Sequence, residues 1–385
     1  MNTWKRWLAA AVLPCLLAGC GAAETPAKDS GPMDHLLGLT QEQRLEDYDY
    51  LVQTLGDSYL CMGVRDRDNP EDPSAAIFQA YREMIQESDS DEVFYSAVYS
   101  TLFRLGTYGH LGIVEPDAYR AYCEAYEDGG IQDREHWREV LTDPVTVRGY
   151  ERLQTLLDAY GEEDDAVNSA GSEEPAANVH TLLLPGGDVG YVKIDSFPAE
   201  YEDGYAADRA ALTDFYRQAA DCTDLIIDLT DNSGGSEIYW QQLLAAPLTD
   251  RPLSCTNYAL LAESGNNRPY IQEVFSPEEL HPIADLPDLP KLERDGIQAA
   301  THFVESTLSV EPAAERAPFH GRIWVLVGPA VYSASESFAV FCQETGFATL
   351  VGSPTGGDGI GALDPVFLQL PNSGILVQFT MMFGL

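Results

Sequence analysis

Ser333 lies at the start of an expected helix, where its hydroxyl could act as a nucleophile or could simply cap the helix. Residues 324–327 read Trp-Val-Leu-Val, an apolar run that predicts a buried strand. Gly328 and Pro329 end this run, and Ser333-Ala-Ser-Glu336 opens a segment with helical apolar spacing. The free N–H groups and the dipole of a helix start can stabilise an oxyanion. The same Ser-x-x-Glu pattern is also a capping box, in which both side chains only bond backbone N–H groups.

A glycine turn earlier in the chain offers further backbone donors. Residues 223–229 predict a buried strand, and a helix is expected over Glu237–Leu244. Between them stands the segment Asp231-Asn-Ser-Gly-Gly-Ser236. Gly234 and Gly235 have no side chains to shield the backbone, so this turn exposes N–H groups to an anion.

A serine nucleophile needs a proton acceptor, and His110 is the candidate. It lies in the tight turn Gly106-Thr-Tyr-Gly-His110-Leu-Gly-Ile-Val114. A neutral imidazole can take a serine proton near pH 7. The sequence contains only four lysines, and none follows Lys291. A single loop histidine more often has no catalytic role, and the next candidates are His180, His302 and His320.

The first twenty residues have the layout of a bacterial export signal. Lys5 and Arg6 precede the apolar stretch Trp7–Leu17, which is too short for a stable membrane span. Leu17-Ala-Gly-Cys20 is similar to a lipobox, in which the cysteine is lipidated and becomes the mature N-terminus. We therefore expect an exported protein held by lipid on Cys20 at the extracytoplasmic face of the cell membrane. An ordinary secretory signal is the alternative.

Composition limits the partners and cofactors. The 385 residues include 62 acidic and 22 basic ones, a formal net charge of −40. This excess argues against nucleic acid and against direct binding to anionic lipid. Five cysteines lie outside the signal, at spacings that indicate neither a disulfide framework nor a metal site. We expect no metal and no cofactor, and leave a single disulfide open.

The chain divides by composition into five segments, an organisation that predicts an α/β core preceded by a small helical domain. Helices are expected over 40–55, Ser74–Gln86 and Asp91–Leu105, and later at Ala118–Tyr126 and Arg148–Tyr160. Residues 251–319 are rich in proline and predict an irregular insertion with one helix near Gly296–Leu308. The expected segments are a signal (1–20), a tether (21–39), a helical domain (40–118), an acidic helical insertion with a linker (119–179) and the core (180–385).

Four segments together resemble the C-terminal processing, or tail-specific, serine peptidases. They are Gly190–Phe197, Leu225–Gly235, Ser333–Glu336 and Leu350–Gly359. The resemblance implies a ββα-spiral core like that of ClpP and crotonase, with Ser333 as nucleophile. It also implies an oxyanion hole from the Ala334 N–H and the Gly234–Gly235 turn, and a protein or peptide substrate.

Within that family the residues favour the branch that uses histidine as base. The best-known branch places a lysine in the turn that here reads Thr355-Gly-Gly-Asp358-Gly, where Asp358 occupies the lysine position. The tricorn-core-like branch instead has a signature resembling Leu-Asn-Asp-Gly-His-Thr. Leu105-Gly-Thr-Tyr-Gly-His110-Leu matches it at the leucine, glycine and histidine, while Tyr108 replaces the aspartate and Leu111 the threonine.

The resulting prediction is an exported, lipid-anchored serine endopeptidase with Ser333 as nucleophile and His110 as base. The alternative is an inactive protein on the same fold that binds a ligand or peptide. In the histidine-using branch a carboxylate beyond the last strand orients the histidine, and no clear counterpart precedes Leu385. We therefore expect this chain to be C-terminally truncated and weakly active, with Asp358 and Asp364 as substitutes for that carboxylate.

Overall fold

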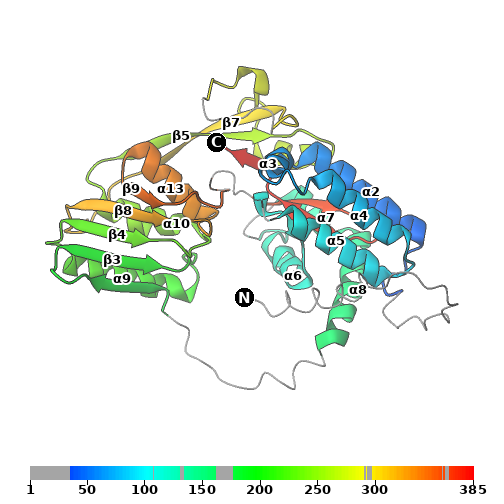
Figure 1. The fold of residues 1–385 in the computed structure, drawn as a ribbon, viewed down its shortest axis with the longest axis horizontal. Coiled ribbons are helices and arrows are strands. Elements are labelled where there is room, and N and C mark those ends of the chain that lie inside the picture. The colour runs from blue at the N-terminus through cyan, green and yellow to red at the C-terminus, as the bar shows by residue number, and fades with distance from the viewer. Residues whose placement is uncertain are drawn as a thin grey trace.

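The computed structural model describes residues 35–106, 108–130, 134–161, 177–289, 292, 297–357, 359 and 364–385. The expected signal with Cys20, most of the tether, the linker residues 162–176 and Asp358 lie outside the described residues. In Figure 1 an α/β part lies on one side and a helical part on the other. The carboxyl ends of the strands β3 (Val189–Ile194) and β4 (Asp224–Asp228) point toward the helical part.

The α/β part is built on a five-stranded sheet with the order β2-β3-β4-β8-β9. β2 is antiparallel to β3, and all other neighbours are parallel. Parallel neighbours need crossover connections, and helices supply them here. The strands are β2 (Val179–Leu183), β3 (Val189–Ile194), β4 (Asp224–Asp228), β8 (Arg322–Val327) and β9 (Thr349–Gly352). The helices are α9 (Asp203–Gln218), α10 (Glu237–Trp240), a π-helical turn (Gln241–Ala245), α11 (Ala246–Leu248) and α13 (Ala334–Thr345).

Alternate residues of the parallel strands form the core of this part. Val192, Ile227 and Val325 are fully buried, and Phe338 and Phe341 of α13 pack in the same cluster. Because buried and partly exposed residues alternate along these strands, the core lies on one face of the sheet. Burial of these apolar side chains is the main force that holds the helices against that face.

The helical part confirms the predicted helices and adds two. α4 and α5 have the predicted bounds, and Thr40 forms a capping box with Gln43 at the start of α2. The helices α3 and α7, of eight residues each, were not predicted from the sequence. The helices are α2 (Gln41–Ser58), α3 (Cys61–Asp68), α4 (Ser74–Gln86), α5 (Asp91–Leu105), α6 (Pro116–Ala125), α7 (Glu135–Thr142) and α8 (Pro144–Gly161).

Strands from the end of the chain complete the helical part. β10 (Val366–Gln369) and β11 (Leu376–Phe379) form a three-stranded sheet with β1 (Gly112–Ile113). Their side chains lie in one buried cluster with those of the N-terminal helices. The last strands of the expected 180–385 core therefore pack with the N-terminal segment, so the helical part is assembled from both ends of the chain.

The segment expected to be an irregular insertion instead forms most of a third sheet, so its predicted helix is wrong. β5 (Leu253–Leu261) and β7 (His302–Val310) are antiparallel and paired over nine positions. β7 occupies the second half of the predicted helix near Gly296–Leu308, because this long-range pairing satisfies its backbone. β6 (His281–Pro282) and β12 (Met382–Gly384) border the sheet, and α12 (Arg268–Val274) lies between β5 and β6 in sequence. The last residues thus include a strand, Met382–Gly384, that pairs with β5.

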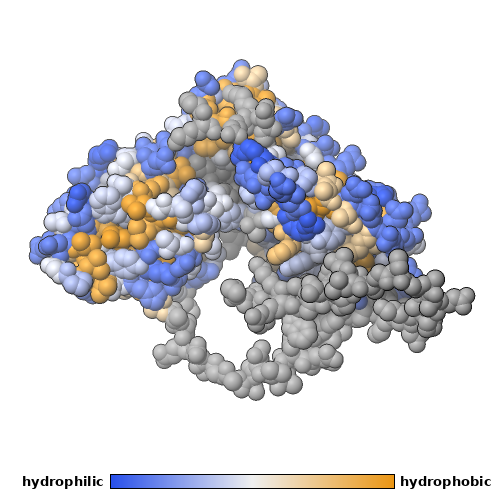
Figure 2. Space-filling model, in the orientation of Figure 1, coloured by the Kyte–Doolittle hydropathy of each residue, from blue (hydrophilic) through white to orange (hydrophobic). Residues whose placement is uncertain are grey.

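The surface combines hydrophilic and hydrophobic regions. Figure 2 shows hydrophilic residues over most of the periphery, with hydrophobic residues reaching the surface on the α/β part. All five cysteines outside the signal are free thiols. None of the helices in the described ranges combines the length and apolar character that a membrane span needs.

Candidate active site

Ser333 is held in a backbone conformation that is rare for a residue with a side chain. It lies between β8 and α13 with φ 55° and ψ −127°, in the positive-φ region. Such a residue stores roughly 1–3 kcal/mol of strain and persists only where its surroundings enforce it. Its side chain makes no capping hydrogen bond, so the capping-box interpretation of Ser333 does not hold. The strained turn instead leaves the hydroxyl available for chemistry.

The glycine turn packs directly against this serine. A Cβ atom added to Gly234 would lie 2.6 Å from the Tyr332 carbonyl oxygen and 3.0 Å from Ser333 Cβ. At Gly235 the same addition would come within 2.1 Å of the Phe197 carbonyl oxygen. Both glycines also have positive φ, 104° and 131°. Only glycine fits either position, and this close fit brings the turn to the nucleophile candidate.

The backbone amides around Ser333 are not equally available. The Gly234 N–H donates to Asn232 Oδ1 at 2.8 Å, so it is already occupied. The N–H groups of Gly235 and Ala334 donate to no acceptor within the described part of the chain. Of the three amides expected to form an oxyanion hole, Gly235 and Ala334 therefore keep a free donor, and Gly234 does not.

His110 lies beside the residue that precedes Ser333. Its backbone N–H donates to Tyr332 Oη at 3.1 Å, a contact between residues 222 positions apart. The two rings have centroids 5.0 Å apart and are tilted by 53°. The short 3₁₀ turn Tyr108–His110 thus faces the Ser333 turn, although α5 and α13 belong to different parts of the molecule.

Neighbouring elements fix the His110 turn. Thr380 N–H donates to the Gly109 carbonyl at 2.6 Å, and the Tyr59 hydroxyl donates to the Tyr108 carbonyl at 2.5 Å. His110 itself has φ 54°. A Cβ atom on Gly109 would lie 2.9 Å from Cys61 Sγ. The histidine is therefore positioned by its backbone, as the glycine-rich sequence predicts.

The alternative bases and the substitute acid make other contacts. His180 Nε2 lies 3.1 Å from Asp195 Oδ2 on the edge of the five-stranded sheet, and His320 precedes β8, at the end opposite Ser333. His302 lies on β7, with its Nδ1 3.6 Å from Glu263 Oε2.

Asp364 accepts hydrogen bonds from the Tyr126 hydroxyl at 2.9 Å and from Arg134 Nε at 3.3 Å. These contacts connect Asp364 to the helical part, and its role as a substitute for the orienting carboxylate stays a prediction.

Three residues at the site were missed by the sequence analysis: Tyr332, Asn232 and Ser335. Tyr332 contacts His110, and Asn232 Oδ1 accepts from the Ser335 hydroxyl at 2.5 Å as well as from Gly234. Asn232 and Ser335 lie within the quoted motifs and Tyr332 directly precedes Ser333, but only their neighbours had been given roles. Their contacts are long-range, so residue type alone could not reveal them.

Glu237 is a partly buried carboxyl that links the helices following the two turns. Its Oε2 accepts from the Ser337 hydroxyl at 3.0 Å and from Trp240 Nε1 at 2.8 Å. Burial raises the pKa of the Glu237 carboxyl from 4.5 to about 7, and the hydrogen bonds only partly oppose this effect. The folded protein therefore binds a proton here more tightly than the unfolded chain does.

We expect Glu237 to make the protein less stable as pH rises. Its contribution is fully present below pH 4.5 and is lost as pH rises through about 7, amounting to at most about 3 kcal/mol. Glu237→Gln should remove this loss, so the variant should gain stability over wild type between pH 5 and 8. Urea unfolding at several pH values measures the difference. A constant difference across this range would contradict the assignment.

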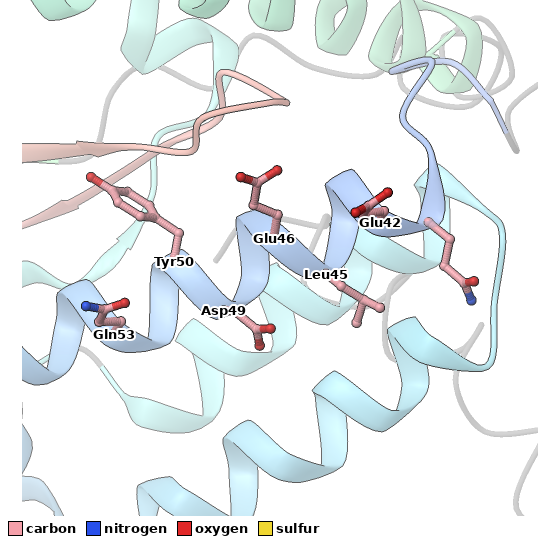
Figure 3. A pocket seen from close by; sticks show the side chains of 7 residues that line it. Glu42, Leu45, Glu46, Asp49, Tyr50 and Gln53 are labelled. Atoms are coloured by element: carbon pink, nitrogen blue, oxygen red, sulfur yellow. The ribbon is translucent and has the colours of Figure 1, made fainter.

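A separate open hollow lies along one face of α2 (Figure 3). It is lined by Gln41, Glu42, Leu45, Glu46, Asp49, Tyr50 and Gln53. All of these belong to a single helix, and none is a serine or a histidine. The hollow is therefore no candidate for the catalytic centre.

Comparison with known families identifies the family to which the chain belongs. Residues 188–382, just over half of the chain, match the family model of Peptidase family S41. The chain belongs to peptidase family S41. The family consists of serine-type hydrolases, which confirms the resemblance to C-terminal processing peptidases. The matched region contains Ser333 and the Gly234–Gly235 turn, whereas His110 lies before it.

Solved structures of low sequence identity share the fold. A mutant of CPAF is 14% identical with a TM-score of 0.51, and the match covers 90% of this chain and 89% of that one. A protein from Parabacteroides merdae, named as a candidate peptidase, is 15% identical with a TM-score of 0.50, covering 89% and 84%. No curated protein matches the sequence. These likenesses confirm the predicted fold, an α/β core preceded by a helical domain.

Proposed function

We propose that this chain is a serine endopeptidase in which Ser333 is the nucleophile and His110 the base. The observation that carries the proposal is the conformation of Ser333. Ser333 has a strained backbone and its side chain does not cap the helix. It packs against the Gly234 turn and directly follows Tyr332, which contacts His110. Strain of this kind concentrates at functional sites.

The chemistry follows from these positions. His110 accepts the proton of Ser333 Oγ while the oxygen attacks the carbonyl carbon of a peptide bond. The carbonyl electrons move to its oxygen, and the N–H groups of Gly235 and Ala334 stabilise the resulting oxyanion. The intermediate collapses to an acyl-enzyme, and the imidazolium returns its proton to the leaving amine. Water then cleaves the ester with His110 again as base, which regenerates the serine.

A fluorophosphonate probe tests this proposal directly. Such a probe phosphonylates an activated serine and expels fluoride, so the purified wild-type protein should acquire one adduct. Digestion and mass spectrometry should locate the adduct on the peptide containing Ser333. Absence of an adduct would favour a binding protein on the same fold, and an adduct elsewhere would exclude Ser333 as the nucleophile.

We further propose export and lipid anchoring through Cys20, on the basis of Leu17-Ala-Gly-Cys20. In a bacterial host the wild-type protein should incorporate a fatty-acid label and sediment with membranes. Cys20→Ser should abolish labelling and leave the signal uncleaved, while the matched change Cys15→Ser within the apolar stretch should not. Labelling that survives Cys20→Ser would contradict the proposal.

A further inference from the structure

We infer that Asn232 is a positioning residue that sets both donors of the oxyanion hole through one side-chain oxygen, with Ser335 as its partner. The inference rests on the proposed function of Ser333. Asn232 is fully buried, with no exposed surface. Buried amides are satisfied by specific partners, so their contacts report a defined geometry.

The surroundings determine which way the Asn232 amide points. Its Nδ2 donates to the Ile194 carbonyl at 3.0 Å, and its Oδ1 accepts from the Gly234 N–H at 2.8 Å. A backbone carbonyl can only accept and a backbone N–H can only donate, so the oxygen must face Gly234. The Ser335 hydroxyl donates to the same oxygen at 2.5 Å.

Asn232 Oδ1 accepts a hydrogen bond from the residue next to each of the two free donors, Gly235 N–H and Ala334 N–H. Gly234 precedes Gly235 in the glycine turn, and Ser335 follows Ala334 in the first turn of α13. Binding the Gly234 N–H removes it from the hole and fixes the peptide that leads to Gly235. Binding Ser335 fixes the helix start that carries the Ala334 N–H. Asn232 and Ser335 are 103 positions apart, so their hydrogen bond ties together the two distant segments that carry the donors and sets the distance between them.

The hydrogen bond from Asn232 Nδ2 to the Ile194 carbonyl attaches this side chain to the central sheet. Ile194 ends β3, and the Asn232 N–H donates to the Leu229 carbonyl just after β4, at 2.8 Å. Asn232 is thus bonded at the carboxyl ends of two central strands, β3 and β4. Loss of a well-placed oxyanion donor lowers kcat by roughly 10²–10³, because the donor acts mainly in the transition state.

The test uses Asn232→Ala and Ser335→Ala, measured by peptide hydrolysis and by inhibition with a peptide aldehyde. The aldehyde forms a hemiacetal on the serine, and its oxygen occupies the oxyanion hole. We expect kcat to fall by roughly 10²-fold for Asn232→Ala and about 10-fold for Ser335→Ala, with KM little changed. Aldehyde affinity should fall in parallel, while affinity for the matching peptide alcohol stays constant.

Ser337→Ala is the matched control. Ser337 is also buried on α13 and also bonds across to another element, but its partner is Glu237 rather than Asn232. Ser337→Ala should leave kcat and aldehyde affinity within about twofold of wild type. The double variant Asn232→Ala/Ser335→Ala should lose no more kcat than Asn232→Ala alone, because both residues act through the same oxygen. If Asn232→Ala does not fold, Ser335→Ala decides the question, since it removes only one hydroxyl.

The outcomes separate this inference from the proposed function. If wild-type protein neither reacts with fluorophosphonate at Ser333 nor hydrolyses peptides, the proposed function fails and this inference fails with it. If wild-type protein is active but folded Asn232 and Ser335 variants keep full kcat, only this inference is wrong. A kcat loss without weaker aldehyde binding would likewise overturn it.

Discussion

Replacement of Ser333 by alanine is expected to lower peptide hydrolysis by at least about four orders of magnitude and to abolish fluorophosphonate labelling. The hydroxyl oxygen forms the covalent bond to the substrate, and no other group in the site replaces it. The fold should persist, because alanine meets the same backbone strain at φ 55° as serine does and no capping bond is lost. Hydrolysis of a fluorogenic peptide and gel-based labelling measure the effect.

An exposed serine provides the control for this variant. Ser306 lies on β7 with its side chain exposed, so Ser306→Ala should retain both labelling and hydrolysis. Labelling that persists in folded Ser333→Ala would exclude Ser333 as the nucleophile. Loss of the thermal unfolding transition would instead indicate that the serine is needed for folding.

Replacement of His110 should reduce hydrolysis and labelling by roughly 10²–10⁴-fold, because the proton acceptor is removed. His110→Asn is the sharper variant, since asparagine tolerates positive φ better than most residues and His110 has φ 54°. It keeps the backbone N–H that donates to Tyr332 Oη, so the turn should stay in place. The labelling rate constant measured at several pH values is the readout.

His180→Ala is the matched histidine control. His180 is exposed on the edge strand β2 and lies against Asp195, so its loss should leave the rate unchanged. A full labelling rate in His110→Asn would contradict the assignment of the base. A loss in His180→Ala instead would transfer the role to that residue.

Much of the local structure followed from the sequence. The helices Ser74–Gln86 and Asp91–Leu105 begin and end at the predicted residues, because their caps and apolar spacing are local signals. The buried strands β4 and β8 were also predicted from apolar runs between turns. Residues 302–310 were not, since their strand depends on pairing with Leu253–Leu261, which no local pattern specifies.

For the site, the sequence by itself determined the chemical groups: the serine, the glycine pair and the histidine, each in a turn where glycine or a helix start controls the backbone. Whether Ser333 caps its helix was decided only by the tertiary structure, which holds it at positive φ without a capping bond. The contact of His110 with Tyr332, and that of Asn232 with Ser335, join residues 222 and 103 positions apart. Such contacts arise when packed elements bring distant turns together, and local sequence patterns carry no information on that distance.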